Sequence, residues 1–95
     1  MRLEFEWNAR KATMNRIKHR VAFEEAASVF SDPTAMAFSD EDHSQLENRE
    51  VIIGHSERRR LLVVCFTKSG RKARIISARR ATTKERREYE QNSIE

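Results

Sequence analysis

The residues that could do chemistry in this chain are mostly arginines, and they gather in its C-terminal part. Residues 58–95 hold twelve Lys and Arg against four acids, whereas the rest of the chain carries a net charge of −4. Arg60 precedes one apolar run, Arg74 and Arg79 bracket the next, and Arg80 follows it. A guanidinium group donates two parallel hydrogen bonds to one phosphate, so this placement predicts a surface for the RNA or DNA backbone. A solvated basic face is the alternative interpretation, and composition alone does not exclude it.

Acid–base chemistry on a phosphodiester needs a group other than arginine, which stays protonated below a pH of ~12. Histidine exchanges protons near neutrality, and His19 is the candidate that we favour. It follows Lys18 at the end of the first expected helix, where it could equally interact with the helix dipole. His43 stands in an acidic stretch and His55 in an expected strand, and we interpret both as non-catalytic. Trp7 could stack on a base, although packing in the core is the commoner role of a tryptophan.

Other kinds of site have little support in the sequence. Three histidines and one cysteine show none of the paired short spacings of structural zinc, and two glycines cannot form a Gly-rich phosphate loop. Cys65 stands in the apolar run 61–66, where we expect a buried small side chain in a reducing compartment. No secretory signal and no run of ~20 apolar residues is present. We therefore expect a cytoplasmic protein with no metal, no cofactor and no membrane segment.

Hydrophobic periodicity predicts a single α+β domain over residues 1–91, followed by a frayed tail at 92–95. Its small, twisted, mostly antiparallel sheet would carry two N-terminal helices and one C-terminal helix. The run at 61–66 is apolar on both faces, which is typical of a central strand. The expected strands are 3–7, 35–38, 50–56, 60–67 and 72–78, and the expected helices are 9–19, 23–30 and 82–91.

Capping residues mark where the helices begin. Asn8 can cap the first helix, and Thr82 with Glu85 forms a capping box for the last one. The second helix presents Phe23, Ala26, Ala27 and Phe30 on one face. The first helix is expected to bury a less regular apolar side made of Ala12, Met14, Ile17 and Val21.

We predict that Arg60 and Arg79 form a catalytic pair. Arg60 opens the expected central strand and Arg79 ends its antiparallel neighbour, so the two termini should lie side by side. Both guanidinium groups could then converge on one phosphate and stabilise the charge that develops during cleavage. Ion pairs with glutamates are expected for Arg86 and Arg87 more than for Arg79.

Motifs spread over residues 5–90 stand in an order and spacing that are more specific than any one of them. They include Phe5-Glu6-Trp7-Asn8, Lys11-x-x-x-Asn15-x-x-Lys18-His19, Phe30-x-Asp32-Pro33, Arg74-Ile75-Ile76-Ser77-Ala78-Arg79 and Thr82-x-x-Glu85-Arg86. Together they resemble the BrnT family of toxins. The resemblance implies a RelE-like fold and a ribonuclease toxin of a type II toxin–antitoxin pair. It also implies neutralisation by a small DNA-binding antitoxin of the BrnA kind, in a hetero-oligomer such as two toxins with two antitoxins.

Two positions depart from the family pattern. Where Lys-His-Gly is usual, this chain has Lys18-His19-Arg20, and where Gly-Arg-Leu-Leu is usual it has Arg59-Arg60-Leu61-Leu62. The first change removes a glycine that ends a helix easily, and the second makes the following hairpin more basic.

Two functions from different classes follow from these observations. The first is an endoribonuclease that inhibits translation and growth. The alternative is a non-catalytic nucleic-acid-binding or regulatory module that acts only within a partner complex, and a purely structural partner protein is a weaker third. Growth arrest that is lost in an arginine variant which still folds and binds its partner would distinguish the first two. For the nuclease, the expected catalytic residues are Arg60, Arg79 and His19, and the expected RNA-binding residues are Lys18, Arg74, Arg80 and Trp7.

Overall fold

The computed structural model describes residues 2–40 and 48–93 of the chain, and within them the predicted α+β fold is confirmed. His43 lies outside the described residues, so its interpretation as non-catalytic is not addressed. The elements in chain order are β1 (Glu4–Glu6), α1 (Ala9–His19), α2 (Phe23–Ser28), a 3₁₀ turn (Val29–Ser31), β2 (Met36–Ser39), β3 (Arg49–His55), β4 (Leu61–Ser69), β5 (Lys72–Arg80) and α3 (Thr83–Ser93).

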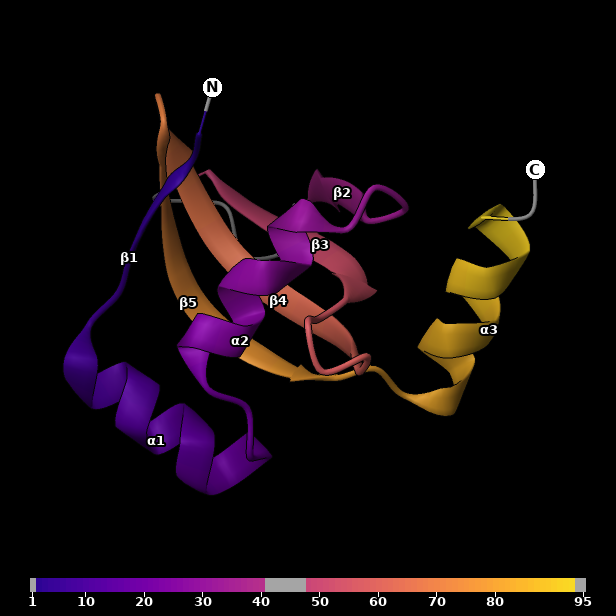
Figure 1. The fold of residues 1–95 in the computed structure, drawn as a ribbon, viewed down its shortest axis with the longest axis horizontal. Helices are drawn as coiled ribbons and strands as arrows, with labels where there is room; N and C mark the ends of the chain where they lie inside the picture. The colour runs from indigo at the N-terminus through magenta and orange to yellow at the C-terminus, as the bar shows by residue number, and fades with distance from the viewer. Residues whose placement is uncertain (1, 41–47, 94–95) are drawn as a thin grey trace.

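The five strands form one sheet in the order β1-β5-β4-β3-β2. β1 runs parallel to β5, and the other neighbours are antiparallel. In Figure 1, α2 lies in front of the sheet and α1 lies below it at the lower left, whereas α3 stands to one side, beyond the end of β5. None of the described helices is long and apolar enough to cross a membrane.

The central strand β4 buries side chains on both faces, as its continuous apolar run predicts. Leu62, Val64 and Phe66 belong to the larger core, which includes Phe23 of α2. The intervening residues of β4 face a smaller cluster that is closed by Tyr89 of α3. β4 therefore separates two cores, one on each face of the sheet. Side chains alternate between the faces along a strand, so the position of a residue in this alternation decides which core its side chain faces.

α1 contacts the sheet through a polar side chain, and the apolar side expected for it is wrong in part. Met14 and Ile17 are 59% and 71% exposed, whereas Asn15 is buried. Asn15 Oδ1 accepts a hydrogen bond from the backbone N–H of Ala78 (3.1 Å), and its Nδ2 donates to the carbonyls of Ala78 (2.8 Å) and Val21 (2.9 Å). β1 pairs only with the first part of β5, so the later part of that edge needs another partner for its backbone. Asn15 supplies it.

Most element ends lie close to their predicted positions. The Asn8 cap is confirmed, since its Oδ1 accepts from the N–H of Lys11 at 3.1 Å. The capping box is confirmed as well: the N–H of Thr82 donates to Glu85 at 2.8 Å, and the N–H of Glu85 donates back to the Thr82 hydroxyl at 3.1 Å. β5 continues two residues further than predicted, through Arg80, because its ladder with β4 extends to Leu62. α3 likewise continues past the expected end at 91, and α2 gives way to the 3₁₀ turn earlier than expected.

Candidate functional site

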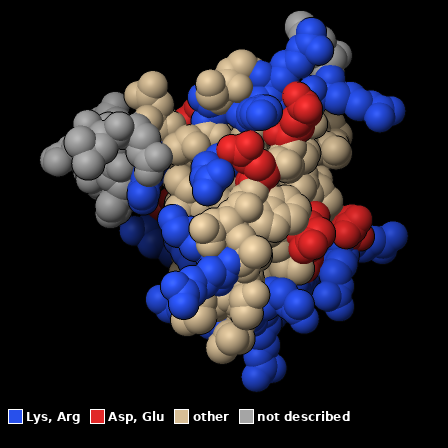
Figure 2. Space-filling view, turned by 90° about the vertical axis from the view of Figure 1, so that its left-hand side faces the viewer, with Lys and Arg blue, Asp and Glu red and all other residues tan. Residues whose placement is uncertain are grey.

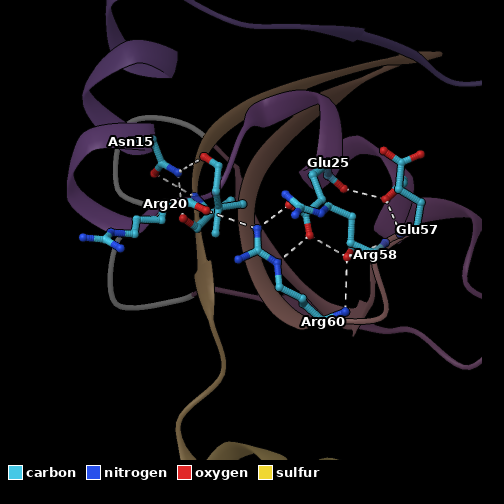
Figure 3. A network of polar contacts seen from close by, with 10 residues as sticks. Asn15, Arg20, Glu25, Glu57, Arg58 and Arg60 are labelled. Carbon is cyan, nitrogen blue, oxygen red and sulfur yellow. Dashed lines mark hydrogen bonds and ion pairs between the residues drawn. The ribbon is translucent and has the colours of Figure 1, made fainter.

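Arg60 is held by a buried carboxylate. Its Nε donates to Glu25 at 2.9 Å, and its Nη2 donates both to Glu25 and, at 3.1 Å, to the backbone carbonyl of Arg20 (Figure 3). Glu25 is only 4% exposed, and it also accepts from the Ser56 hydroxyl at 2.7 Å. The hydrogen bond from Arg60 is the main reason that the pKa of Glu25 lies below its ordinary value, against the opposing effect of burial. Arg60 therefore joins α2, the end of α1 and the β3–β4 hairpin.

Arg79 lies on the opposite face of the sheet from Arg60. It stands opposite Val63 in the β4–β5 ladder, and directly opposed residues share a face, so its side chain points toward the smaller core. Arg60 instead reaches Glu25 of α2, on the face of the larger core. The strand ends do lie side by side as predicted, but the alternation of side chains sends the two guanidinium groups apart. The structure does not bring them to one phosphate.

Arg79 also has a carboxylate partner of its own. Its Nη1 and Nη2 donate to the two oxygens of Glu85, each at 2.8 Å. Hydrogen bonding from Arg79, helped by that from Thr82, lowers the pKa of Glu85 to about 2 although burial opposes the shift. The expectation that Arg86 and Arg87 would pair with glutamates before Arg79 is wrong, since neither forms an ion pair with an acid that the structure describes.

Unpaired cations gather where the end of α1, the β3–β4 hairpin and the end of β5 meet. Arg20 lies there because its carbonyl receives Arg60, and Arg80 lies there because it faces Leu62 across the ladder. All the side chains in this group are exposed, and within the described part of the chain none makes an ion pair. We call the group the basic end, and it consists of Lys18, Arg20, Arg58, Arg59 and Arg80.

His19 stands between Lys18 and Arg20 of the basic end. It is half-buried in the last turn of α1, one turn beyond Asn15 and on the same side of the helix. Since Asn15 fixes that side against β5, His19 is carried by a rigid element. α1 thus carries Lys18 and His19 of the predicted site at its C-terminal end, where the carbonyl of Arg20 accepts from Arg60.

The remaining predicted RNA-binding residues lie elsewhere. Arg74 pairs with Glu6 of β1 at 3.2 Å, and along β5 it is six residues, or ~20 Å, from Arg80. Trp7 is half-buried, and its ring meets that of Phe23 edge-on at 5.9 Å. Neither residue joins the basic end, and packing against the larger core accounts for Trp7.

The face of the sheet next to α3 is hollowed. The hollow has a volume of about 500 Å³, and its walls include Met36, Phe38, Tyr89 and the Arg79–Glu85 pair. Phe38 is 54% exposed there. Cys65, expected to be buried, is half-buried and lines the same hollow.

A second polar network, which sequence reasoning missed, ties α3 to the loop before β2. Asp32 accepts from the backbone N–H of His55 (2.7 Å) and of Thr34 (2.9 Å), and His55 Nδ1 lies 3.6 Å from it. Burial raises the pKa of Asp32, but these hydrogen bonds outweigh burial and leave the pKa lowered. The Thr34 hydroxyl meets that of Tyr89 at 2.6 Å, and the His55 and Tyr89 rings stack edge-on. His55 is satisfied in this way.

Basic side chains spread widely over the molecular surface. On the face shown in Figure 2 they surround the acidic side chains, which form a few small groups. Among the residues that the structure describes, no group of three or more His, Cys, Asp or Glu side chains could hold a metal ion.

Comparisons with known proteins agree with this architecture. Residues 7–85 match the family model described as the ribonuclease toxin BrnT of type II toxin–antitoxin systems. The crystal structure of the Brucella abortus ribonuclease toxin BrnT superposes with a TM-score of 0.65 at 21% identity, covering 85% of this chain and 99% of that one. A search of curated proteins found no match. Because the family model covers most of its length, the chain belongs to the BrnT family of ribonuclease toxins.

Proposed function

We propose that this protein cleaves RNA, inhibits translation and thereby arrests growth until a cognate BrnA-like antitoxin neutralises it. The observation that carries the proposal is the basic end, five exposed cations without ion-pair partners among the described residues, on a chain of a ribonuclease toxin family. Unpaired guanidinium and ammonium groups can bind phosphate without first losing a carboxylate.

The proposed reaction takes place at one phosphodiester held over the basic end. The RNA 2′-oxygen bonds to phosphorus, the bond from phosphorus to the 5′-oxygen breaks, and the 2′-hydroxyl proton leaves as the 5′-oxygen gains one. Lys18 and Arg80 hold the phosphate and stabilise its added negative charge. His19 is the proposed proton-transfer group, because imidazole can exchange protons near neutral pH.

Arg60 is assigned a positioning role in this scheme. Its donors are committed to Glu25 and to the carbonyl of Arg20, so it fixes the end of α1 that carries His19. Arg79 holds Glu85 at the start of α3 on the other face, which removes it from the same phosphate.

The basic end also suggests how the toxin is controlled. An acidic segment of the antitoxin laid across it would block RNA by charge complementarity. We propose a cytoplasmic complex of even stoichiometry, such as two toxins with two antitoxins. A strict toxin monomer in the presence of co-expressed antitoxin would contradict this part of the proposal.

The test is incubation of the purified protein with a defined RNA, together with expression in growing cells. The parent should cleave, with EDTA present as well as without it, because the basic end itself supplies the positive charge. Arg80→Ala should lose most cleavage and toxicity without a change in melting temperature. Arg86→Ala is the matched control, since it removes another exposed arginine, one that lies in α3 outside the basic end. A parent protein that binds RNA but neither cleaves it nor arrests growth would be the non-catalytic module instead.

A further inference from the structure

Two arginines of the basic end adopt a backbone conformation that arginine disfavours. Arg20 and Arg59 have φ values of 58° and 63°, and they are the two non-glycine residues with positive φ in the described part of the chain. An L side chain in this left-handed region brings its Cβ close to the backbone, which is why glycine normally stands there. Gly70, in the β4–β5 turn, shows the ordinary choice at φ 60°.

Both positions are of a kind where glycine serves best. Arg20 is the residue that ends α1, with its N–H bonded to the carbonyl of Arg16. Arg59 is the third residue of the β3–β4 turn, in which its N–H donates to Ser56 and the Ser56 N–H donates to Arg60. Helix ends and three-residue hairpins both favour glycine at the left-handed position. Arginine at both places is therefore unfavourable for the fold taken alone.

One residue, Arg60, connects the two strained arginines. Arg60 directly follows Arg59, and its guanidinium donates to the carbonyl of Arg20 (Figure 3). Arg60 itself is neutralised by Glu25, so the positive charge available at this point comes from its neighbours. Residues held in sparsely populated conformations tend to mark functional sites. Here, both residues are exposed and each borders Arg60, Arg59 along the chain and Arg20 through its carbonyl.

We infer that Arg20 and Arg59 form an anchoring site for the RNA backbone, one that lengthens the binding surface beyond the phosphate held by Lys18 and Arg80. This inference rests on the proposed function for its choice of RNA. Two guanidinium groups on separate loops can each fork onto a phosphate, so the site takes successive phosphates of one strand. Its role is to hold the substrate in register, and neither residue takes part in proton transfer.

Glycine substitutions test the inference directly, since they remove the charge while suiting the backbone. Binding is measured by fluorescence anisotropy with a labelled, fully 2′-O-methylated RNA, which cannot be cleaved through its 2′-oxygens. For the double variant R20G/R59G, the salt dependence of log K should decrease by ~1.4, about 0.7 per lost contact. Affinity at ~0.15 M salt should then fall about tenfold. The melting temperature should stay level or rise.

Matched variants separate charge from backbone conformation. R20K/R59K keeps both charges in the same left-handed positions, so it should retain most of the salt dependence and lose part of the affinity. R86A removes an exposed arginine of α3, outside the basic end, and should leave binding close to the parent. Parent-like affinity and salt dependence in R20G/R59G would overturn the inference. So would unchanged RNA binding combined with weaker antitoxin binding, because the surface would then belong to the partner.

A failure of the anchoring site can be distinguished from a failure of the proposed function. Cleavage of unmodified RNA is measured on the same preparations. A parent that binds with the expected salt dependence but does not cleave would remove the catalytic proposal, while a loss of binding in R20G/R59G would still support the anchoring site.

Discussion

Replacement of Arg60 by alanine should destabilise the fold rather than act on catalysis alone. Glu25 is 4% exposed and Arg60 21%, so the substitution leaves a nearly buried carboxylate without its main partner. Breaking a buried ion pair from one side costs about 3 kcal/mol or more. For a domain of this size, each kcal/mol corresponds to roughly 4–8 °C in melting temperature. We therefore expect Arg60→Ala to melt some ~12–24 °C below the parent.

The pH dependence of stability should show that the unpaired Glu25 carboxylate causes the loss in Arg60→Ala. In the parent, the folded-state pKa of Glu25 lies below its ordinary value of 4.5, so its contribution to stability is present above that pH and is lost as pH falls through the folded value. Without Arg60, burial becomes the main influence and raises the pKa of Glu25. The folded variant then binds its proton more readily than the unfolded chain does. The difference in unfolding free energy between parent and Arg60→Ala should shrink as pH falls from 7 toward 4.

Urea unfolding at several pH values measures the loss of stability and its pH dependence. A second variant provides the control. Glu25→Gln combined with Arg60→Met removes both charges, so it should lose less stability than Arg60→Ala and show little of the same pH dependence. If Arg60→Ala melts within two or three degrees of the parent at pH 7, the buried pair does not hold the hairpin to α2. A loss of toxicity in Arg60→Ala is informative only below its melting temperature.

Other substitutions test the remaining parts of the structure. Arg79→Ala should lower stability by no more than about 1 kcal/mol because its pair with Glu85 is partly exposed, and urea melts should show a weaker loss of stability below pH 4.5 than in the parent. If it abolishes RNA cleavage instead, the active face is the hollow beside α3. His19→Ala should reduce cleavage and flatten its pH profile near neutrality without changing the melting temperature, whereas parent-like kinetics would exclude His19. Asn15→Ala leaves two backbone groups of Ala78 unsatisfied and should cost about 2–3 kcal/mol in urea unfolding. Deletion of α3 removes Tyr89 and uncovers the smaller core that this residue closes, so it should lower the melting temperature by several degrees, and a change within a degree or two would contradict its packing.

Local patterns were enough to predict the elements of this fold. The Asn8 cap, the capping box before α3 and the doubly apolar run of β4 each depend on residues close in sequence, and all are confirmed. The parallel pairing of β1 with β5 joins residues almost seventy positions apart, and no local pattern predicts it. For the same reason, the role of Asn15 could not be derived, although a polar residue amid the expected apolar side of a helix was a usable signal.

The candidate site was predicted less well because its geometry depends on the two-residue alternation of a sheet. The adjacency of the two strand ends was inferred correctly. Whether two side chains share a face, however, depends on which single residues stand opposite each other in the β4–β5 ladder. A bulge between Cys65 and Phe66 shifts this pairing by one residue. A shift of one position changes the face, so a prediction accurate to one or two residues cannot decide it. The same limit applies to counting charges, since composition treats the neutralised Arg60 and Arg79 as equal to the unpaired Arg80. What sequence could supply was the set of cations, and pairing with Glu25 and Glu85 then decides which of them remain available to a phosphate.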